Sequence, residues 1–221
     1  MRIIVSFLLS VTFFACHKNR EEITIPYSEA SYKVIITLNW MGPAFGVPAG
    51  AHVTTVTGMV HNKDTFLWMP GKPATPGLED VAEIGNNTKM NAELDPIIAK
   101  NKAFSKFAIT LPAVTGTVET SLTLNTNYSY ISFASMIAPS PDWFMGIHDY
   151  NLLNGNTWIN DITINVVVYD AGTEDGDVFG YNNPATVPQQ NVALLTPANA
   201  SVLANGNASI ASIGTIRFIK N

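Results

Sequence analysis

The stretch DITINVVVYDAGTEDGD, residues 161–177, joins two kinds of sequence that together decide the fold of this chain. Residues 161–169 are rich in β-branched side chains, which favour a β-strand. Residues 170–177 are acidic and contain Gly172 and Gly176, which allow a loop to curl around an ion. The stretch therefore predicts a β-sheet protein in which one strand ends in an acidic loop.

The rest of the chain repeats this strand character. Its 221 residues are 47% hydrophobic and 13% charged, which is enough apolar material for one large core. We expect a single, mainly β domain in which antiparallel sheets pack face to face as a β-sandwich, with one or two short helices. The expected strands cover residues 32–40, 107–111, 116–124, 128–137, 144–153, 161–169 and 215–219, and residues 53–60 form a further strand or an extended loop.

Two segments have helical patterns. Residues 77–83 place Leu78, Val81 and Ala82 on one face of a helix. Asp95 followed by Pro96 is typical of an N-cap and the first helical residue, so a second short helix is expected to begin there.

An acid far upstream of the loop is expected to meet it. A strand over residues 128–137 runs toward Asp142, a strand over 144–153 runs back, and the strand over 161–169 runs forward to Asp170. The two reversals place both acids at one end of the sandwich, where such folds commonly carry binding groups. Calcium prefers six to eight oxygen ligands in flexible loops, so this end is a predicted calcium site. A solvated acidic turn is the alternative.

Several motifs occur in the order found in a known family. They are GMVHN at 58–62, FLW at 66–68, GLEDVAEIG at 77–85, SPDWFMG at 140–146, YDAGT at 169–173 and TVPQ at 186–189. Through them the chain resembles the spondin N-terminal domain family, the calcium-binding module of F-spondin and mindin.

The resemblance implies a C2-like antiparallel β-sandwich over residues 30–221 and a Ca2+ ion held by Asp142 and Asp170. Family members usually have DAGTD where this chain has DAGTE followed by another acid, so the third acidic ligand is either Glu174 or Asp175. Backbone carbonyls and water would complete the shell.

The first residues have the pattern of a targeting segment. An apolar run over residues 3–14 is too short to span a bilayer and is followed by Cys16. We expect residues 1–15 to be a lipoprotein signal peptide, Cys16 to be lipidated, and residues 16–29 to be a flexible linker. The protein would then be a bacterial outer-membrane lipoprotein held at the cell envelope by acyl chains. An ordinary signal peptide is the alternative, and an acidic pair at residues 21–22 favours surface exposure.

Charge and motif content narrow the classes of function. The net charge is -5 and the twelve Lys and Arg residues form no basic stripe, so nucleic acid is not an expected partner. The sequence has no nucleophile elbow or phosphate-binding loop, and His52, His61 and His148 are expected to be structural. We expect a calcium-binding adhesion module without catalytic activity. Its partner would be a protein or glycan at the cell surface, with membrane contact through the lipid anchor only.

Two other functions stay open on the sequence. A carbohydrate-active hydrolase would use two of Asp142, Asp170 and Glu174 as its acid and base. Alternatively, the calcium is structural and the working surface lies on residues 40–51 or 66–69. Trp143 and Phe144 are expected to support the core in either case.

Overall fold

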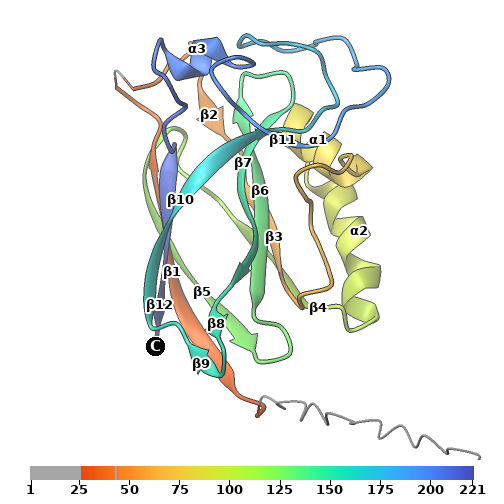
Figure 1. Ribbon diagram of the computed structural model, residues 1–221, viewed down its shortest axis with the longest axis vertical. Coiled ribbons are helices and arrows are strands. Elements are labelled where there is room, and N and C mark those ends of the chain that lie inside the picture. Colours follow the sequence, from red (N-terminus) through yellow and green to blue (C-terminus); the bar gives the residue numbers. More distant parts are fainter. Residues whose placement is uncertain (1–25, 43) are drawn as a thin grey trace, which may run out of the picture.

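The structure is a computed structural model that describes residues 26–42 and 44–221, and it consists mainly of antiparallel β-strands (Figure 1). Eight strands form a hydrogen-bonded path in the order β4-β3-β6-β7-β10-β12-β1-β5. Their bounds in this order are Ala103–Ile109, Val56–His61, Tyr130–Ala138, Trp143–Asn151, Asp161–Asp170, Gly214–Lys220, Glu29–Asn39 and Thr115–Asn125. Short strands β2 (His52–Val53) and β11 (Ala193–Leu194) pair with β6 and β10, and β8 (Leu153–Asn154) pairs with β9 (Thr157–Trp158).

Strand β10 connects the two layers of the sandwich. Its residues 167–170 pair with β7, whereas its residues 161–166 pair with β12. Strands β4 and β5 stand at the two ends of the strand order. The expected mainly β, antiparallel sandwich is therefore confirmed, and the shared strand gives it a nearly barrel-like shape (Figure 1).

The core lies between the layers and follows from the alternation within each strand. In β1, every second residue from Ala30 to Leu38 is buried, and Tyr32 and Val34 are completely inaccessible. Burial of one such large side chain stabilises the fold by about 1.5–3 kcal/mol. A second apolar cluster, which includes Trp68, Phe144 and Leu78, lies where the helices cover the β3-β6-β7 layer.

Helix α1 (Pro76–Ile84) confirms the helix expected over residues 77–83. The hydroxyl of Thr75 caps it by accepting a hydrogen bond from the Leu78 N–H, and the helix ends at Gly85, which has a φ of 64°. Leu78, Val81 and Ala82 are all buried, as their spacing predicts. The short helix α3 (Ser201–Ala204) lies in the long connection before β12.

The expected start of the second helix was wrong. Helix α2 (Thr88–Ala99) begins seven residues before Asp95, and Pro96 lies in its last turn. Met90 and Leu94, one turn apart, are buried in the cluster shared with α1, so tertiary packing makes the upstream residues helical. Pro96 has no N–H to donate to the Ala92 carbonyl, and its ring crowds that oxygen, so the buried Met90 and Leu94 have to offset both costs.

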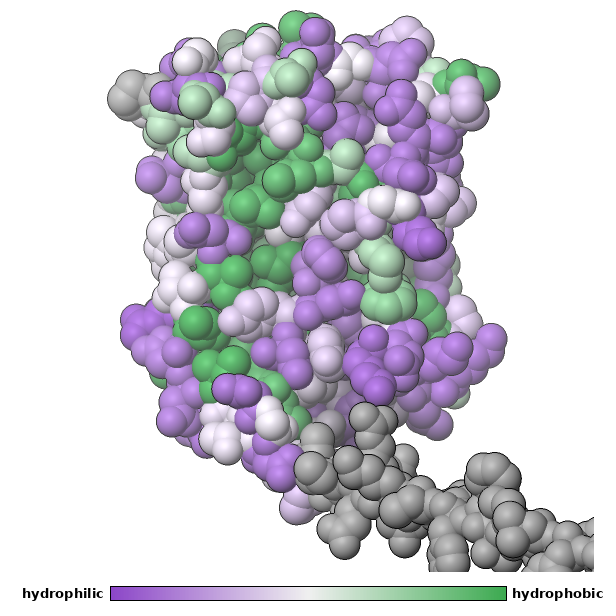
Figure 2. All heavy atoms as spheres, viewed as in Figure 1, coloured by the Kyte–Doolittle hydropathy of each residue, from purple (hydrophilic) through white to green (hydrophobic). Residues whose placement is uncertain are grey.

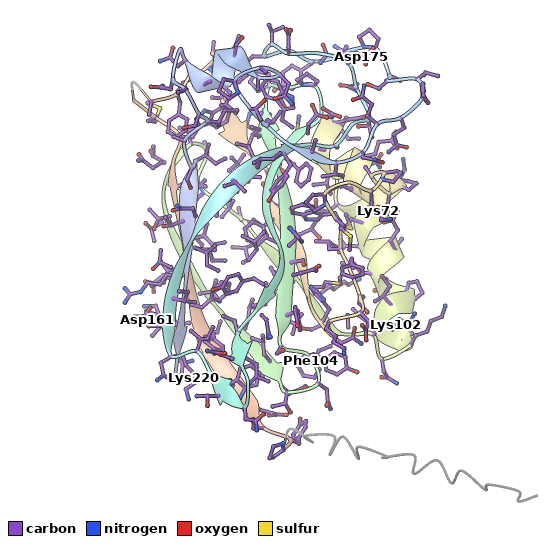
Figure 3. The ribbon with its side chains drawn as sticks, in the orientation of Figure 1. Lys72, Lys102, Phe104, Asp161, Asp175 and Lys220 are labelled. Carbon is purple, nitrogen blue, oxygen red and sulfur yellow. The ribbon has the colours of Figure 1, made fainter. Side chains whose placement is uncertain are left out.

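The two ends of the sandwich differ. Strands β6 and β10 both end at the end that carries loop 139–142 and the long connection 171–213, whereas β1 begins at the opposite end (Figure 1). Asp175 lies among the loops, and Asp161 and Lys220 lie toward the opposite end (Figure 3). A chain entering the domain at residue 26 thus arrives far from the acidic loop.

On the face shown in Figure 2, hydrophobic side chains reach the surface beside β10, and hydrophilic ones predominate on the side of α2. Ile162 and Ile164 of β10 are partly buried against the core. In the described part of the chain, no helix combines the length and apolarity needed to cross a membrane. The signal peptide, Cys16 and most of the linker lie outside the described residues.

Candidate metal centre

Asp142 lies in the connection between β6 and β7 and is completely buried. Its Oδ2 accepts hydrogen bonds from the backbone N–H of Thr173 at 2.6 Å, from the Thr173 hydroxyl at 3.2 Å and from the Glu174 N–H at 3.1 Å. Its Oδ1 is equally inaccessible and has no hydrogen-bond donor. Burial raises the pKa of Asp142, against the effect of the donors at Thr173 and Glu174 and of the Gly172 N–H.

Asp170 is the last residue of β10 and pairs with Trp143 of β7, directly beside Asp142 in the chain. The expected meeting of the two acids at one end of the sandwich is therefore confirmed. The Asp170 Oδ1 accepts a hydrogen bond from the Gly172 N–H at 2.7 Å. Burial raises the pKa of Asp170 to about 6, and the nearby charge of Asp142 contributes to the rise.

The acidic loop owes its shape to Gly172 and to a second segment that runs beside it. Gly172 has a φ of +75°, and a Cβ there would lie 2.6 Å from the Gln190 carbonyl oxygen. Backbone hydrogen bonds of 2.8 Å join the Asp175 N–H to Pro184, the Thr186 N–H to Thr173 and the Gln190 N–H to Gly172. The TVPQ motif at 186–189 thus belongs to the support of the acidic loop.

The structure distinguishes the two candidates for a third acidic ligand. The pKa of Glu174 is raised to about 7 by burial and by the charges of Glu83 and Asp142, so its carboxyl lies within the field of the other acids. Asp175 is exposed, and its Oδ1 accepts a hydrogen bond from the Thr186 hydroxyl at 2.6 Å. Both residues and Asp170 line a cavity of about 190 Å³. Glu174 is the better placed of the two to share a cation with Asp142.

Glu83 is an acid that the sequence reasoning missed as part of this centre. It lies on α1, and the Thr173 side chain stands beside both Glu83 and Asp142. Burial raises the pKa of Glu83, and the charges of Glu79, Asp142 and Asp80 add to the rise. The signal was present in the motif GLEDVAEIG, which was interpreted as a helix and as a family motif but not as a source of site residues.

The acids of this centre have no cationic partner among the described residues. Every ion pair between a Lys or Arg and a carboxylate in the described part of the chain lies elsewhere: Lys33 with Glu119, Lys89 with Asp80, Lys106 with Asp95, and Arg217 with Asp161. Negative charge therefore collects around Asp142, Asp170 and Glu174 without a basic partner, and Glu83 has only the more distant charge of Lys89, which is paired with Asp80.

The donor set suits calcium in kind, because all of these groups are hard oxygen ligands on loops or a helix. The buried Asp142 Oδ1 without a donor is the observation that most favours this carboxylate as a cation ligand. As the side chains stand, no three Asp, Glu, His or Cys residues of the described part lie close enough together to hold a metal ion. Asp142 and Asp170 would be the fixed ligands, and the Glu174 side chain would have to turn toward them.

Comparison with known proteins gives a matching family. The Spondin_N family profile matches residues 30–206, a span that contains both fixed acids and the acidic loop. The chain belongs to the Spondin_N family. It is 30% identical to human Spondin-2 over 181 residues, which cover 78% of this chain and 54% of that protein. It is 29% identical to chicken Spondin-1 over 151 residues, which cover 66% of this chain and 19% of that protein.

This Spondin_N chain therefore spans about half the length of its Spondin-2 relatives and a much smaller share of Spondin-1. The matched region runs from β1 through α3, and β12 lies beyond it. The resemblance inferred from the ordered motifs is thus confirmed at the level of the family.

Aromatic residues near the Spondin_N acids are structural supports, as predicted. Trp143 and Phe144 are both completely buried, and Phe144 stacks on Tyr169 with ring centroids 5.6 Å apart. Trp68 is also buried and donates from its indole N–H to the Phe133 carbonyl at 3.1 Å. Within residues 66–69, the large exposed side chain is Phe66.

A serine–histidine pair elsewhere in the molecule is part of the polar core. The His61 Nε2 lies 2.9 Å from the Ser132 Oγ, and both side chains are completely buried. The His61 Nδ1 is bonded to the Asn62 carbonyl at 2.8 Å, so no carboxylate orients the ring from that side. Because neither side chain reaches solvent, the pair is unsuited to act on a substrate.

Proposed function

We propose that this protein is a non-catalytic binding module that takes up calcium at the loop end of its sandwich. One observation carries the proposal: the Asp142 carboxylate is completely buried, one of its oxygens has no donor, and neighbouring acids add further uncompensated charge. A divalent cation there would neutralise the acids and join loop 139–142 to the loop after β10.

Asp142, Asp170 and Glu174 are the proposed side-chain ligands, and Asp175 is the less favoured alternative. Asp142 already holds the loop through the N–H groups of Thr173 and Glu174, so it positions the ligand loop before any ion arrives. When bound, calcium supplies positive charge and a fixed set of oxygen contacts. Backbone carbonyls and water are proposed to complete its coordination.

The loops around these acids are the proposed partner-binding surface. Val178, Tyr181 and Val187 are large exposed apolar side chains on the long connection that includes the acidic loop, and Val187 is 87% exposed. Such groups beside a polar centre are typical of surfaces that bind proteins or glycans. Membership of the Spondin_N family supports an extracellular binding or adhesion role.

Attachment to a bacterial envelope through lipidated Cys16 belongs to the same proposal and rests on the sequence pattern alone. Labelling with a radioactive fatty acid tests it. The full chain should incorporate label and lose it in Cys16→Ser, and an unlabelled wild-type chain would contradict the anchor without affecting the calcium proposal.

Acid–base catalysis by the same residues is the competing proposal. Asp142 is poorly suited to it, because its side chain is completely buried and one oxygen is already bound by three donors. Asp170 and Glu174 line the adjacent cavity, and their raised pKa values would suit a proton donor. The two proposals make opposite predictions about chelation.

Thermal unfolding with calcium and with chelator tests the proposal. At a calcium concentration 100-fold above Kd, the ligand stabilises the folded protein by about 2.7 kcal/mol, or roughly 5–10 °C in Tm for a protein of this size. Titration calorimetry should show heat on addition of calcium to the metal-free chain. An unchanged Tm together with no heat would reject the calcium site, and glycan cleavage that persists in chelator would favour the enzyme.

A further inference from the structure

The two strands at the ends of the sheet differ in how their outer edges are protected. An edge strand presents unpaired N–H and C=O groups, and natural proteins protect such edges with bulges, charged residues, short strands or covering helices. Strand β4 has several of these protections. It has seven residues, its pairing with β3 shifts register between Val60 and His61, α2 packs against it, and its Lys106 is ion-paired with Asp95 of that helix.

Strand β5 has almost none of them. It runs for eleven residues, TGTVETSLTLN, with a regular register against β1 over its entire length. Glu119 is its only charged residue, and it contains neither lysine nor proline. Its backbone pairs with β1 on one side, and among the described residues no backbone hydrogen bond joins residues 115–124 to any segment on the other side. The ladder left open is roughly 36 Å long at 3.3 Å per residue.

We infer that the outer edge of β5 pairs with the β5 edge of a second copy of this chain, forming a sheet continuous across a symmetric dimer. The argument for a second copy is that the strand is complementary to itself. In the antiparallel register that pairs all eleven residues, Thr120 meets Thr120 and residue 115 meets residue 125.

This register matches the side chains on both faces. Val118, Thr120 and Leu122 are partly buried and alternate with the exposed Thr117, Glu119 and Ser121. Across the dimer Val118 would face Leu122 on the core side, and Glu119 would face Ser121 on the solvent side. Apolar residues thus meet each other, and the two Glu119 side chains are not opposed.

The register also keeps the existing ion pair. Within one copy, Glu119 is 2.7 Å from Lys33 on β1, and Lys33 stands opposite Ser121 in the β1–β5 ladder. In the dimer, the Ser121 that faces Glu119 of one copy has Lys33 of its own copy on its other side. The charges across the junction would therefore run in the order Lys33, Glu119, Glu119, Lys33, and each Glu119 would keep the lysine of its own copy as its partner.

This inference does not depend on calcium, because β5 contributes no residue to the acidic centre. Self-association should be the same in calcium and in chelator, which separates its failure from failure of the calcium site. A partner other than a second copy, such as an extended peptide from another protein, would leave the isolated chain monomeric.

A charge-exchange experiment tests the inference on the full chain by sedimentation equilibrium. In the proposed register, Thr117 of one copy faces Thr123 of the other, and both side chains are exposed. The double variants T117K/T123K and T117E/T123E each place like charges opposite one another. We expect the wild type to dimerise, and each variant to show a dissociation constant at least ten-fold higher. An equimolar mixture of the two variants should recover the dimer.

The matched control adds the same charge on an interior strand. T163K/N165K places two lysines at exposed positions of β10, in the part of that strand that pairs with β12 and not with β5, and should leave the dissociation constant within two-fold of the wild type. A monomeric wild type, or a dimer that persists in both charged variants, would overturn the inference. Weakened variants that do not associate when mixed would overturn the proposed register.

Discussion

Among the described residues, four carboxylates on strands and helices have a Lys or Arg partner, whereas the carboxylates at the loop end have none. Glu119, Asp161, Asp95 and Asp80 each lie against a Lys or Arg. Asp142, Asp170 and Glu174 have no such partner among the described residues. Their burial makes the lack of a partner unfavourable, because removing an unpaired charge from water costs free energy. The paired acids can be explained by the chain alone. The proposed calcium would supply positive charge to the unpaired acids.

The largest expected effect comes from the most buried unpaired acid. Asp142→Ala leaves the N–H groups of Thr173 and Glu174 without an acceptor, and each unsatisfied buried donor costs about 1–3 kcal/mol. We expect a clear fall in Tm without calcium and no gain when calcium is added. Asp161→Ala, which removes an exposed paired acid, is the matched control and should change Tm little and keep the calcium response. Equal effects of the two changes would remove the distinction between the two groups of acids.

The second prediction concerns Asp170, whose substitution should affect Tm in opposite directions without and with calcium. Asp170→Asn removes one of two like charges that oppose each other, while the amide oxygen can still accept from the Gly172 N–H. Without calcium, Tm should rise by about 2–4 °C, the shift that 1 kcal/mol produces in a protein of this size. With calcium, the gain seen in the wild type should disappear. A variant that retains the full calcium gain would exclude Asp170 from the site.

A smaller effect decides between the neighbouring candidates for the third ligand. Glu174→Gln should raise the calcium Kd about ten-fold, the loss produced by 1.4 kcal/mol of binding energy. Asp175→Asn should change Kd less than two-fold, because this exposed carboxylate is bound to the Thr186 hydroxyl. Titration calorimetry on both variants measures the difference, and a reversed order would make Asp175 the ligand.

The smallest expected effect compares two acids on one helix. Glu83 is unpaired and stands beside the Thr173 side chain, whereas Asp80 is paired with Lys89. Glu83→Gln should weaken calcium binding by roughly 2–3-fold through loss of nearby negative charge, and Asp80→Asn should change it less. Calorimetry at low ionic strength gives the best resolution, since salt screens such contributions. A ten-fold loss in Glu83→Gln would instead make Glu83 a direct ligand.

The sequence predicted the parts of the fold that depend on local periodicity. The β-rich runs that form β1 and β10 and the helical face of α1 were interpreted correctly. The start of α2 was not, because Asp95 and Pro96 form a good local start signal that packing of Met90 and Leu94 overrides. Local signals cannot show which upstream residues a neighbouring helix will bury.

The candidate site was predictable in outline for a similar reason. Counting chain reversals was enough to bring Asp142 and Asp170 together, since consecutive antiparallel strands alternate in direction. Glu83 was missed, because its approach depends on how α1 packs over the sheet. The absence of cationic partners for these acids was equally hidden, because any of the twelve basic residues could have been folded against them.

The position at which the chain enters the domain determines how two associated copies would be oriented relative to a membrane. Residue 26 arrives at the end of the sandwich opposite the acidic loops (Figure 1). In a pair joined through antiparallel β5 strands, the two entry points lie at opposite poles. Two copies anchored in opposite, facing membranes would fit this arrangement. Two copies anchored in the same membrane would have to lie with their strands parallel to it, or reach it through extended N-terminal linkers. With the proposed lipid anchor on each copy, such a junction would span a gap between two cells.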